Sequence, residues 1–201
     1  MLVSRPKSYK IAYMAVLAAL NIVANTFISI PIGGDLQFSV TIFMSILTGI
    51  IIGPIFGAVA VFIGDAVGYL VNSWGLMYMP WVGLSCAVMA IIAGFIMNGV
   101  KLKFRGAVYV KLAIVSVLVL IVCTVGINTT GFYIFYTKVG FSAKAMGYIA
   151  DRFGGSVTYW TYLLCRMVFM GQIYNSLFNY ALLFAAVPIL NSLKPLKIKI
   201  Q

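Results

Sequence analysis

The chain of 201 residues is 63% hydrophobic and only 8% charged, with a formal net charge of +11. Soluble domains carry about 25% charged residues, so this composition excludes a water-soluble protein and indicates an integral membrane protein. The sequence contains no histidine and only 3 acidic residues. Because hydrolytic and metal-dependent chemistry usually relies on such groups, we expect neither an enzyme nor a metal site.

Long apolar runs predict six membrane-spanning helices, since a helix of about 20 residues crosses a bilayer. In chain order the predicted spans cover residues 11–30, 37–52, 54–71, 80–97, 112–136 and 160–190. Residues 31–36 are expected to form a turn and residues 72–80 an aromatic loop. Residues 137–160 form the longest polar connection, which has room for a short surface helix. We therefore expect one domain over residues 1–201, an all-α compact bundle of six transmembrane helices.

The basic residues indicate how the predicted bundle is oriented. Ten of the 14 Lys and Arg residues lie in the N-terminal tail, the segment 99–111 and the C-terminal tail. Cytoplasmic segments of membrane proteins carry an excess of Lys and Arg, and six spans place these three segments on one side. Both termini are therefore predicted to be cytoplasmic. The segments 31–36, 72–80 and 137–160 are predicted to face outward.

The second and third predicted spans meet at Gly53-Pro54 with no polar loop between them. Proline disfavours helix at the residue before it and is favoured at the first helical position, so one helix ends and the next begins here. Asp65 follows in the third span and is expected to face a neighbouring helix or a cavity. We assign Gly53, Pro54 and Asp65 to structural support. The third span also carries a ridge of small residues suited to close helix packing: Gly57, Ala60, Gly64 and Gly68.

Polar side chains inside the predicted spans gather in the outer half of the bundle. An ionisable group in a span costs a few kcal/mol unless it is paired or hydrated, which makes Asp65 and Arg166 candidates for function. The topology places Asn25 near the outer end of the first span and Asn128 near that of the fifth. Two interpretations stay open: Asp65 and Arg166 pair to hold the bundle together, or Arg166 contacts a ligand in an outward-facing pocket.

Aromatic residues surround the predicted outer end. Trp74, Tyr78 and Trp81 form either an interfacial belt or a lid that stacks on a flat ligand. Asp35 and Phe38, beside the first outward turn, complete the candidate substrate-binding residues. Further tyrosines are assigned to an interfacial belt: Tyr133, Tyr136, Tyr159 and Tyr162.

Two further patterns favour contacts between helices. Ala15 and Ala19 form a small-xxx-small pair, which suits docking either against another protein or within this bundle. Gln172, Asn175 and Asn179 form one polar stripe on the last span, for which we expect helix–helix hydrogen bonds.

Taken in order, these features resemble the substrate-binding S component of an energy-coupling factor (ECF) vitamin transporter, of the folate-type subfamily. The resemblance covers essentially the whole chain and rests on four segments: the hairpin from Leu47 through Gly53-Pro54 to Asp65, the segment Pro80-Trp81-Val82-Gly83, Ile127-Asn128-Thr129 and Arg166.

The resemblance implies a multi-pass protein of the bacterial plasma membrane that binds a folate-like or other vitamin-sized heterocycle. It implies a transmembrane coupling subunit as partner, docked on Ala15 and Ala19, and two cytoplasmic ATPase subunits that use ATP. This chain has no P-loop and no cofactor of its own. Delivery would occur by toppling of the whole S component. Other ligands remain open, among them a pyridoxine-like molecule, hydroxymethylpyrimidine or a deazapurine, as does a stand-alone facilitator or channel.

Overall fold

A computed structural model describes residues 7–32, 36–71, 77–102 and 104–192. Two residues of the predicted site, Asp35 and Trp74, lie outside these ranges. The described elements follow in this order: α1 (Lys7–Phe27), β1 (Ser29–Ile32), β2 (Leu36–Ser39), α2 (Thr41–Ile52), α3 (Pro54–Val71), α4 (Pro80–Gly99), α5 (Ala107–Leu118), η2 (Val119–Thr129), α6 (Thr130–Val139), α7 (Ala143–Phe153), α8 (Tyr159–Leu164), η3 (Cys165–Phe169) and α9 (Gln172–Ser192). The segments η2 and η3 are π-helical.

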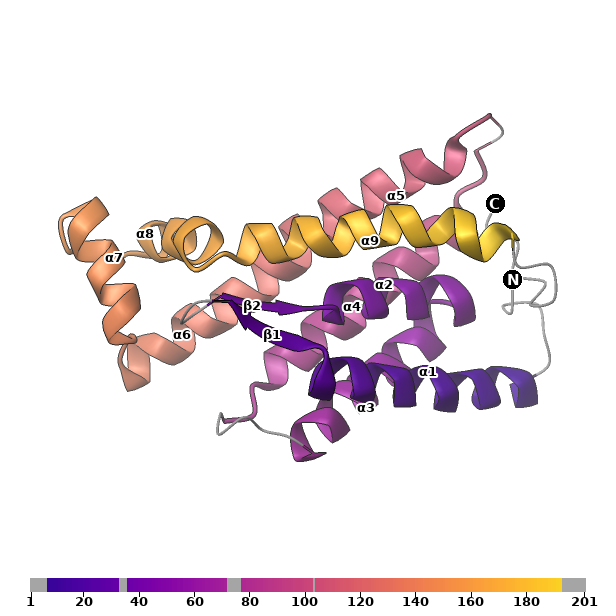
Figure 1. Ribbon diagram of the computed structural model, residues 1–201, viewed down its shortest axis with the longest axis horizontal. Helices are drawn as coiled ribbons and strands as arrows, with labels where there is room; N and C mark the ends of the chain where they lie inside the picture. The colour runs from indigo at the N-terminus through magenta and orange to yellow at the C-terminus, as the bar shows by residue number, and fades with distance from the viewer. Residues whose placement is uncertain (1–6, 33–35, 72–76, 103, 193–201) are drawn as a thin grey trace.

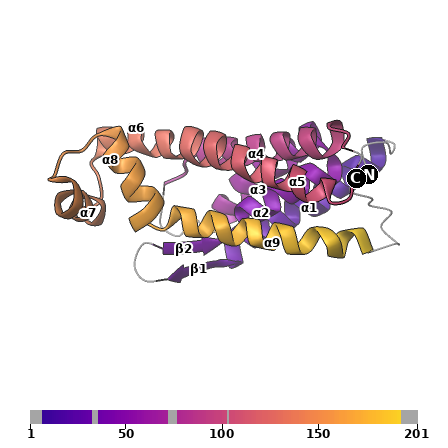
Figure 2. The ribbon, with the colours of Figure 1, turned by 90° about the horizontal axis from the view of Figure 1, so that it is seen from above.

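The molecule is an elongated helical bundle (Figures 1 and 2). The start of α1 and the end of α9 lie at one end, while α6, α7 and α8 lie at the other. One continuous helical run, made of α5, η2 and α6, extends along the bundle. A small β-hairpin, β1–β2, lies beside α9.

Within the described ranges, four helices are long and apolar enough to cross a membrane. They match the first, third, fourth and fifth predicted spans: Ser8–Thr26, Pro54–Val71, Pro80–Gly99 and Ala107–Val139. The second predicted span corresponds to α2, which is apolar but has only 12 residues. The structure therefore supports a helical membrane bundle, while six spans and cytoplasmic termini stay predictions.

The segment between α1 and α2 differs from the prediction. The residues that the prediction placed at the ends of two helices form an antiparallel hairpin, in which β1 pairs with β2 and Ser29 lies opposite Ser39. The first helix therefore ends at Phe27 and the second begins only at Thr41. Pro31 explains part of this difference, because proline removes a helical hydrogen bond and pushes the residue before it towards extended backbone.

The last predicted span is not continuous. It is divided into α8, η3 and α9, with a break at Met170 and Gly171. Gly171 has φ 73°, a left-handed conformation that glycine adopts without steric cost. The short surface helix expected within 137–160 is confirmed as α7.

The Gly53-Pro54 junction is confirmed as the boundary between two helices. The N–H group of Gly53 donates to the carbonyl oxygen of Gly49 at 3.0 Å and ends α2 at φ 94°, and Pro54 is the first residue of α3. The small-residue ridge packs as expected. A Cβ atom at Gly57 would lie 2.8 Å from Cα of Gly49, and one at Gly64 would lie 2.8 Å from Cβ of Asn21, so α3 approaches both α2 and α1 closely.

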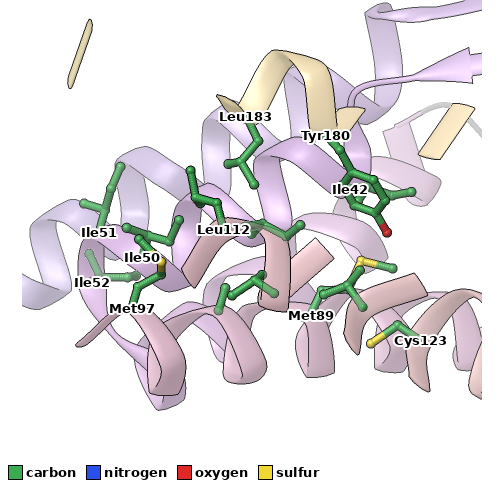
Figure 3. Packing of buried hydrophobic residues seen from close by; sticks show 14 of the residues in the cluster. Ile42, Ile50, Ile51, Ile52, Met89, Met97, Leu112, Cys123, Tyr180 and Leu183 are labelled. Carbon is green, nitrogen blue, oxygen red and sulfur yellow. The ribbon is translucent and has the colours of Figure 1, made fainter. Parts of the chain in front are cut away.

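The apolar core lies between α2, α4, the α5–η2 run and α9 (Figure 3). Its fully buried side chains come from all of these elements: Ile46, Ile50, Met89, Met97, Leu112, Val115, Val119 and Leu183. On the predicted polar stripe of α9, Asn175 and Asn179 bond to the backbone of β2 and of the first turn of α2. The expected helix–helix hydrogen bonding is thus confirmed for Asn179.

Candidate functional site

The candidate site is centred on the ring of Phe132, at the start of α6. The guanidinium carbon of Arg166, in η3, lies 4.1 Å from the centroid of this ring. The indole ring of Trp81, in the first turn of α4, meets it edge to face at 5.7 Å. Cation–π contacts act within about 6 Å, so Phe132 links side chains from three separate elements.

Gly131 allows Trp81 to lie this close to α6. A Cβ atom at Gly131 would overlap the indole ring, so the missing side chain leaves room for it against the helix backbone. Trp81 also packs against the ring of Phe135 at 5.7 Å. The start of α4 is thereby fixed relative to the start of α6.

Several buried polar atoms at this site have no hydrogen-bond partner within the described part of the chain. They are Nε1 of Trp81, Oδ1 of Asn128 and Nε of Arg166. We call Trp81, Phe132, Tyr162 and Arg166, together with Asn128 four residues before Phe132, the Phe132 cluster. Buried polar groups are normally bonded, and an unsatisfied one costs a few kcal/mol. This combination of donors, an acceptor and aromatic faces is chemically suited to a flat molecule with polar edges.

Two polar residues of the cluster, Asn128 and Arg166, lie in π-helical segments. Asn128 belongs to η2 and Arg166 to η3. In η3 the N–H group of Met170 donates to the carbonyl oxygen of Cys165 at 2.9 Å, five residues back. Such turns often occur at functional sites, because the extra residue redirects the side chains.

Tyr162 was assigned to the interfacial belt, and this prediction is wrong. Its side chain is 0% exposed and packs against Tyr133, Tyr136 and Phe141 at centroid distances of 5.8, 6.4 and 5.3 Å. It also interacts with Arg166, one turn further along the chain.

Phe132 is likewise a site residue that the sequence did not predict. The spacing along the chain could have indicated both residues. Phe132 lies four residues after Asn128, and Tyr162 lies four residues before Arg166. In a helix that spacing places two side chains on one face.

Asp65 and Arg166 do not pair with each other. The Oδ2 atom of Asp65 and the hydroxyl of Tyr78 both lie beside Gly83 of α4, whereas Arg166 covers Phe132. No ion pair joins the two residues in the described ranges, and the pairing interpretation is therefore wrong. Burial, followed by the nearby Asp65 carboxylate, raises the pKa of Tyr78.

Two other predicted site residues make contacts elsewhere. Oδ1 of Asn25 accepts a hydrogen bond from the hydroxyl of Thr41 at 2.7 Å, joining α1 to α2. The ring of Phe38 meets that of Phe178 edge to face at 5.5 Å, joining β2 to α9. These contacts hold the scaffold together, and a role of Asn25 and Phe38 in ligand binding stays a prediction.

The alanine pair of α1 lies on an exposed face of the bundle. Ala15 and Ala19 are both exposed, and large apolar neighbours on the same helix are exposed with them: Ile11, Val16, Leu20 and Val23. Packing of this pair within the bundle, one of the two interpretations, is therefore wrong for the described structure.

Comparison with known proteins identifies a family and a fold. The model of the family described as ECF-type riboflavin transporter, S component, matches residues 6–158. No curated protein matches the chain. The crystal structure of FolT bound with folic acid resembles this fold with a TM-score of 0.50 and 21% sequence identity, over 85% of this chain and 93% of that chain. Family and fold are those of a substrate-binding component of a transporter and not of an enzyme. The chain, as its resemblance to S components implied, belongs to the family of S components of ECF-type riboflavin transporters.

Proposed function

We propose that this vitamin-binding S component captures a flat heterocycle from outside the cell at the Phe132 cluster. The observation that supports this most directly is the set of unpaired buried polar atoms around one aromatic ring. In a membrane protein such atoms are costly unless a ligand or water satisfies them. Arg166 supplies the positive charge, Trp81 a second donor and Asn128 an acceptor.

The ligand class that fits these groups best is a fused ring system with a pyrimidine edge. Riboflavin, named in the family description, and folic acid, bound to FolT, both contain such a ring system. The aromatic faces of Trp81 and Phe132 offer stacking surfaces, and the polar atoms of Asn128 and Arg166 complement the carbonyl and N–H groups of the ring edge. We rank the single-ring candidates, pyridoxine-like molecules and hydroxymethylpyrimidine, below it, whereas a deazapurine has such a fused ring system and falls within the preferred class.

Binding to the purified protein in detergent tests this proposal. Riboflavin, folic acid, pyridoxine and hydroxymethylpyrimidine are titrated separately by calorimetry, and mass spectrometry identifies any molecule that co-purifies. We expect affinity in the micromolar range or tighter for a fused-ring compound. Binding of single-ring compounds alone would contradict the ligand class, and binding of none would contradict the site.

Tryptophan fluorescence locates the bound ligand. Trp81 lies in the Phe132 cluster, whereas Trp160 is 69% exposed and serves as the matched control. Quenching by the ligand should be largely lost in Trp81→Phe and retained in Trp160→Phe. The reverse pattern would place the ligand elsewhere.

Import itself would require partner subunits. The exposed apolar face of α1 around Ala15 and Ala19 suits docking against a transmembrane helix, because small residues allow close approach. A coupling subunit would bind there, and two cytoplasmic ATPases would supply energy for toppling of the loaded S component. Uptake is compared in cells with and without these partners. Transport that survives loss of the ATPases would overturn ATP coupling and favour a stand-alone facilitator.

A further inference from the structure

We propose that α7 is a positioning element for Arg166, which acts by holding the π-helical segment η3 in place. This inference rests on the proposed function, because it assigns α7 a role in ligand binding at the Phe132 cluster. Both views place α7 near α8 at one end of the bundle, and Figure 1 shows it running across that end (Figures 1 and 2).

The first contact between α7 and η3 is the packing of α7 side chains around the ring of Phe169. Tyr148 stacks on this ring at 5.6 Å with an interplanar angle of 22°. The guanidinium carbon of Arg152 lies 5.6 Å from the same ring centroid, and Phe153 approaches it edge to face at 6.5 Å. Three side chains of one helix thus fix the last residue of η3.

The second contact fixes the first residue of η3. The thiol of Cys165 lies 3.9 Å from the carbonyl oxygen of Ala145, as a weak hydrogen bond. Cys165 is fully buried, and Ala145 and Ile149 of α7 are buried with it. Both ends of the five-residue segment that carries Arg166 are therefore held by the same helix.

The local chain gives η3 little support of its own. It follows the six-residue helix α8 and ends at Gly171, where the left-handed conformation interrupts the helix. A π turn is rarer and less regular than an α turn. Relaxation to an α turn would change the register by one residue, about 100° around the helix axis, and would turn Arg166 away from Phe132.

A double-mutant cycle tests whether α7 acts through Arg166. Dissociation constants for riboflavin, and in parallel for folic acid, are measured by calorimetry for Phe169→Leu, Arg166→Met and the double variant. We expect Phe169→Leu to weaken binding about tenfold and Arg166→Met by more. The double variant should bind like Arg166→Met alone, because the contact between α7 and Phe169 no longer has an Arg166 side chain to position. Phe169→Tyr, which keeps the ring, should restore wild-type affinity.

A second variant keeps the test valid if Phe169→Leu does not fold. Arg152 is exposed, so Arg152→Met removes the charge over Phe169 with little effect on packing. It should weaken binding about threefold in the wild type and not at all in Arg166→Met. Lys144→Met, at another exposed cation of α7, is the matched control and should leave affinity unchanged.

The outcomes separate this inference from the proposed function. Suppose that Arg166→Met weakens binding, and that Phe169→Leu or Arg152→Met weakens it by the same factor in the Arg166→Met background as in the wild type. The positioning role is then overturned and the binding site stands. The same holds if neither α7-side variant changes affinity. If Arg166→Met binds like the wild type, or if the wild type binds none of the four compounds titrated above, both proposals are overturned.

Discussion

Asn179, in the middle of α9, caps the first turn of α2. Its Oδ1 atom accepts a hydrogen bond from the backbone N–H group of Phe43 at 2.9 Å, and its Nδ2 atom donates to the carbonyl oxygen of Ser39 at 2.7 Å. Asn175 adds a third bond, in which the N–H group of Ser39 donates to its Oδ1 atom at 3.1 Å. The base of the β-hairpin and the start of α2 are thereby fastened to α9.

Asn179→Leu is expected to destabilise the protein by about 1–2 kcal/mol, because it removes the partners of a partly buried donor at Phe43 and a partly buried acceptor at Ser39. Thermal unfolding in detergent measures the change. Ser176→Ala is the matched control, since Ser176 is equally buried and its hydroxyl donates to the carbonyl oxygen of Gln172 within its own helix. Equal melting temperatures for the two variants would refute the capping role.

Two glycines predict opposite effects of the same substitution. A Cβ atom at Gly94 of α4 would lie 2.6 Å from the nitrogen of Pro54, so Gly94→Ala should force α3 and α4 apart at a cost of about 2–3 kcal/mol. A Cβ atom at Gly147 of α7 would meet no atom within 4 Å. Gly147→Ala should therefore stabilise the protein by about 0.5–1 kcal/mol, through helix propensity. Melting temperatures that fall alike would contradict the packing argument.

The parts of the fold that follow from local sterics could be predicted from the sequence. Gly53-Pro54 determines a helix boundary through the backbone alone. The hairpin could not be predicted, because its short apolar segments look like the ends of spans and its pairing joins Ser29 to Ser39. The break at Gly171 was equally hidden, since a single glycine in an apolar run is compatible with a continuous helix.

The polar residues of the candidate site could be predicted from the sequence, because burying a polar group in a membrane costs free energy. Arg166 and Asn128 stand out in the sequence because such groups are rare within membrane spans. Phe132 and Tyr162 do not, because an aromatic residue in a span is equally compatible with lipid contact. Their place in the site depends on the π-helical register of η2 and η3, which tertiary packing determines.

Arg166→Ala should weaken binding of the fused-ring ligand more than tenfold, about 1.4 kcal/mol, because the cation above Phe132 is lost. Calorimetry on the folded variant measures this loss. Arg105→Ala removes an exposed charge from the connection between α4 and α5, and serves as the matched control. Unchanged affinity in Arg166→Ala would reduce Arg166 to a structural role.

Tyr78 predicts a loss of stability in alkaline solution. Its pKa is raised above the ordinary value of 10.0, so the folded state holds the phenol proton more tightly than the unfolded chain does. The resulting stability is fully present below the unfolded pKa and is lost as the pH rises through the folded pKa. Tyr78→Phe should therefore lose less stability than the wild type above about pH 10. Tyr174→Phe, at an exposed tyrosine, is the control, and identical alkaline profiles of the wild type and Tyr78→Phe would contradict the prediction.

Ala15→Trp separates ligand binding from transport. The exposed alanine pair lies on α1, whereas the residues of the Phe132 cluster come from α4, η2, α6, α8 and η3, so a bulky side chain on α1 should leave affinity unchanged. On the proposed docking face, however, it would hold a partner helix away by several ångströms and abolish uptake. Val117→Trp adds the same bulk to α5, where Val117 is 56% exposed, and should preserve both activities. Uptake retained by Ala15→Trp would remove this face of α1 from the coupling interface. Lost affinity would instead mean that α1 contributes to the ligand site itself.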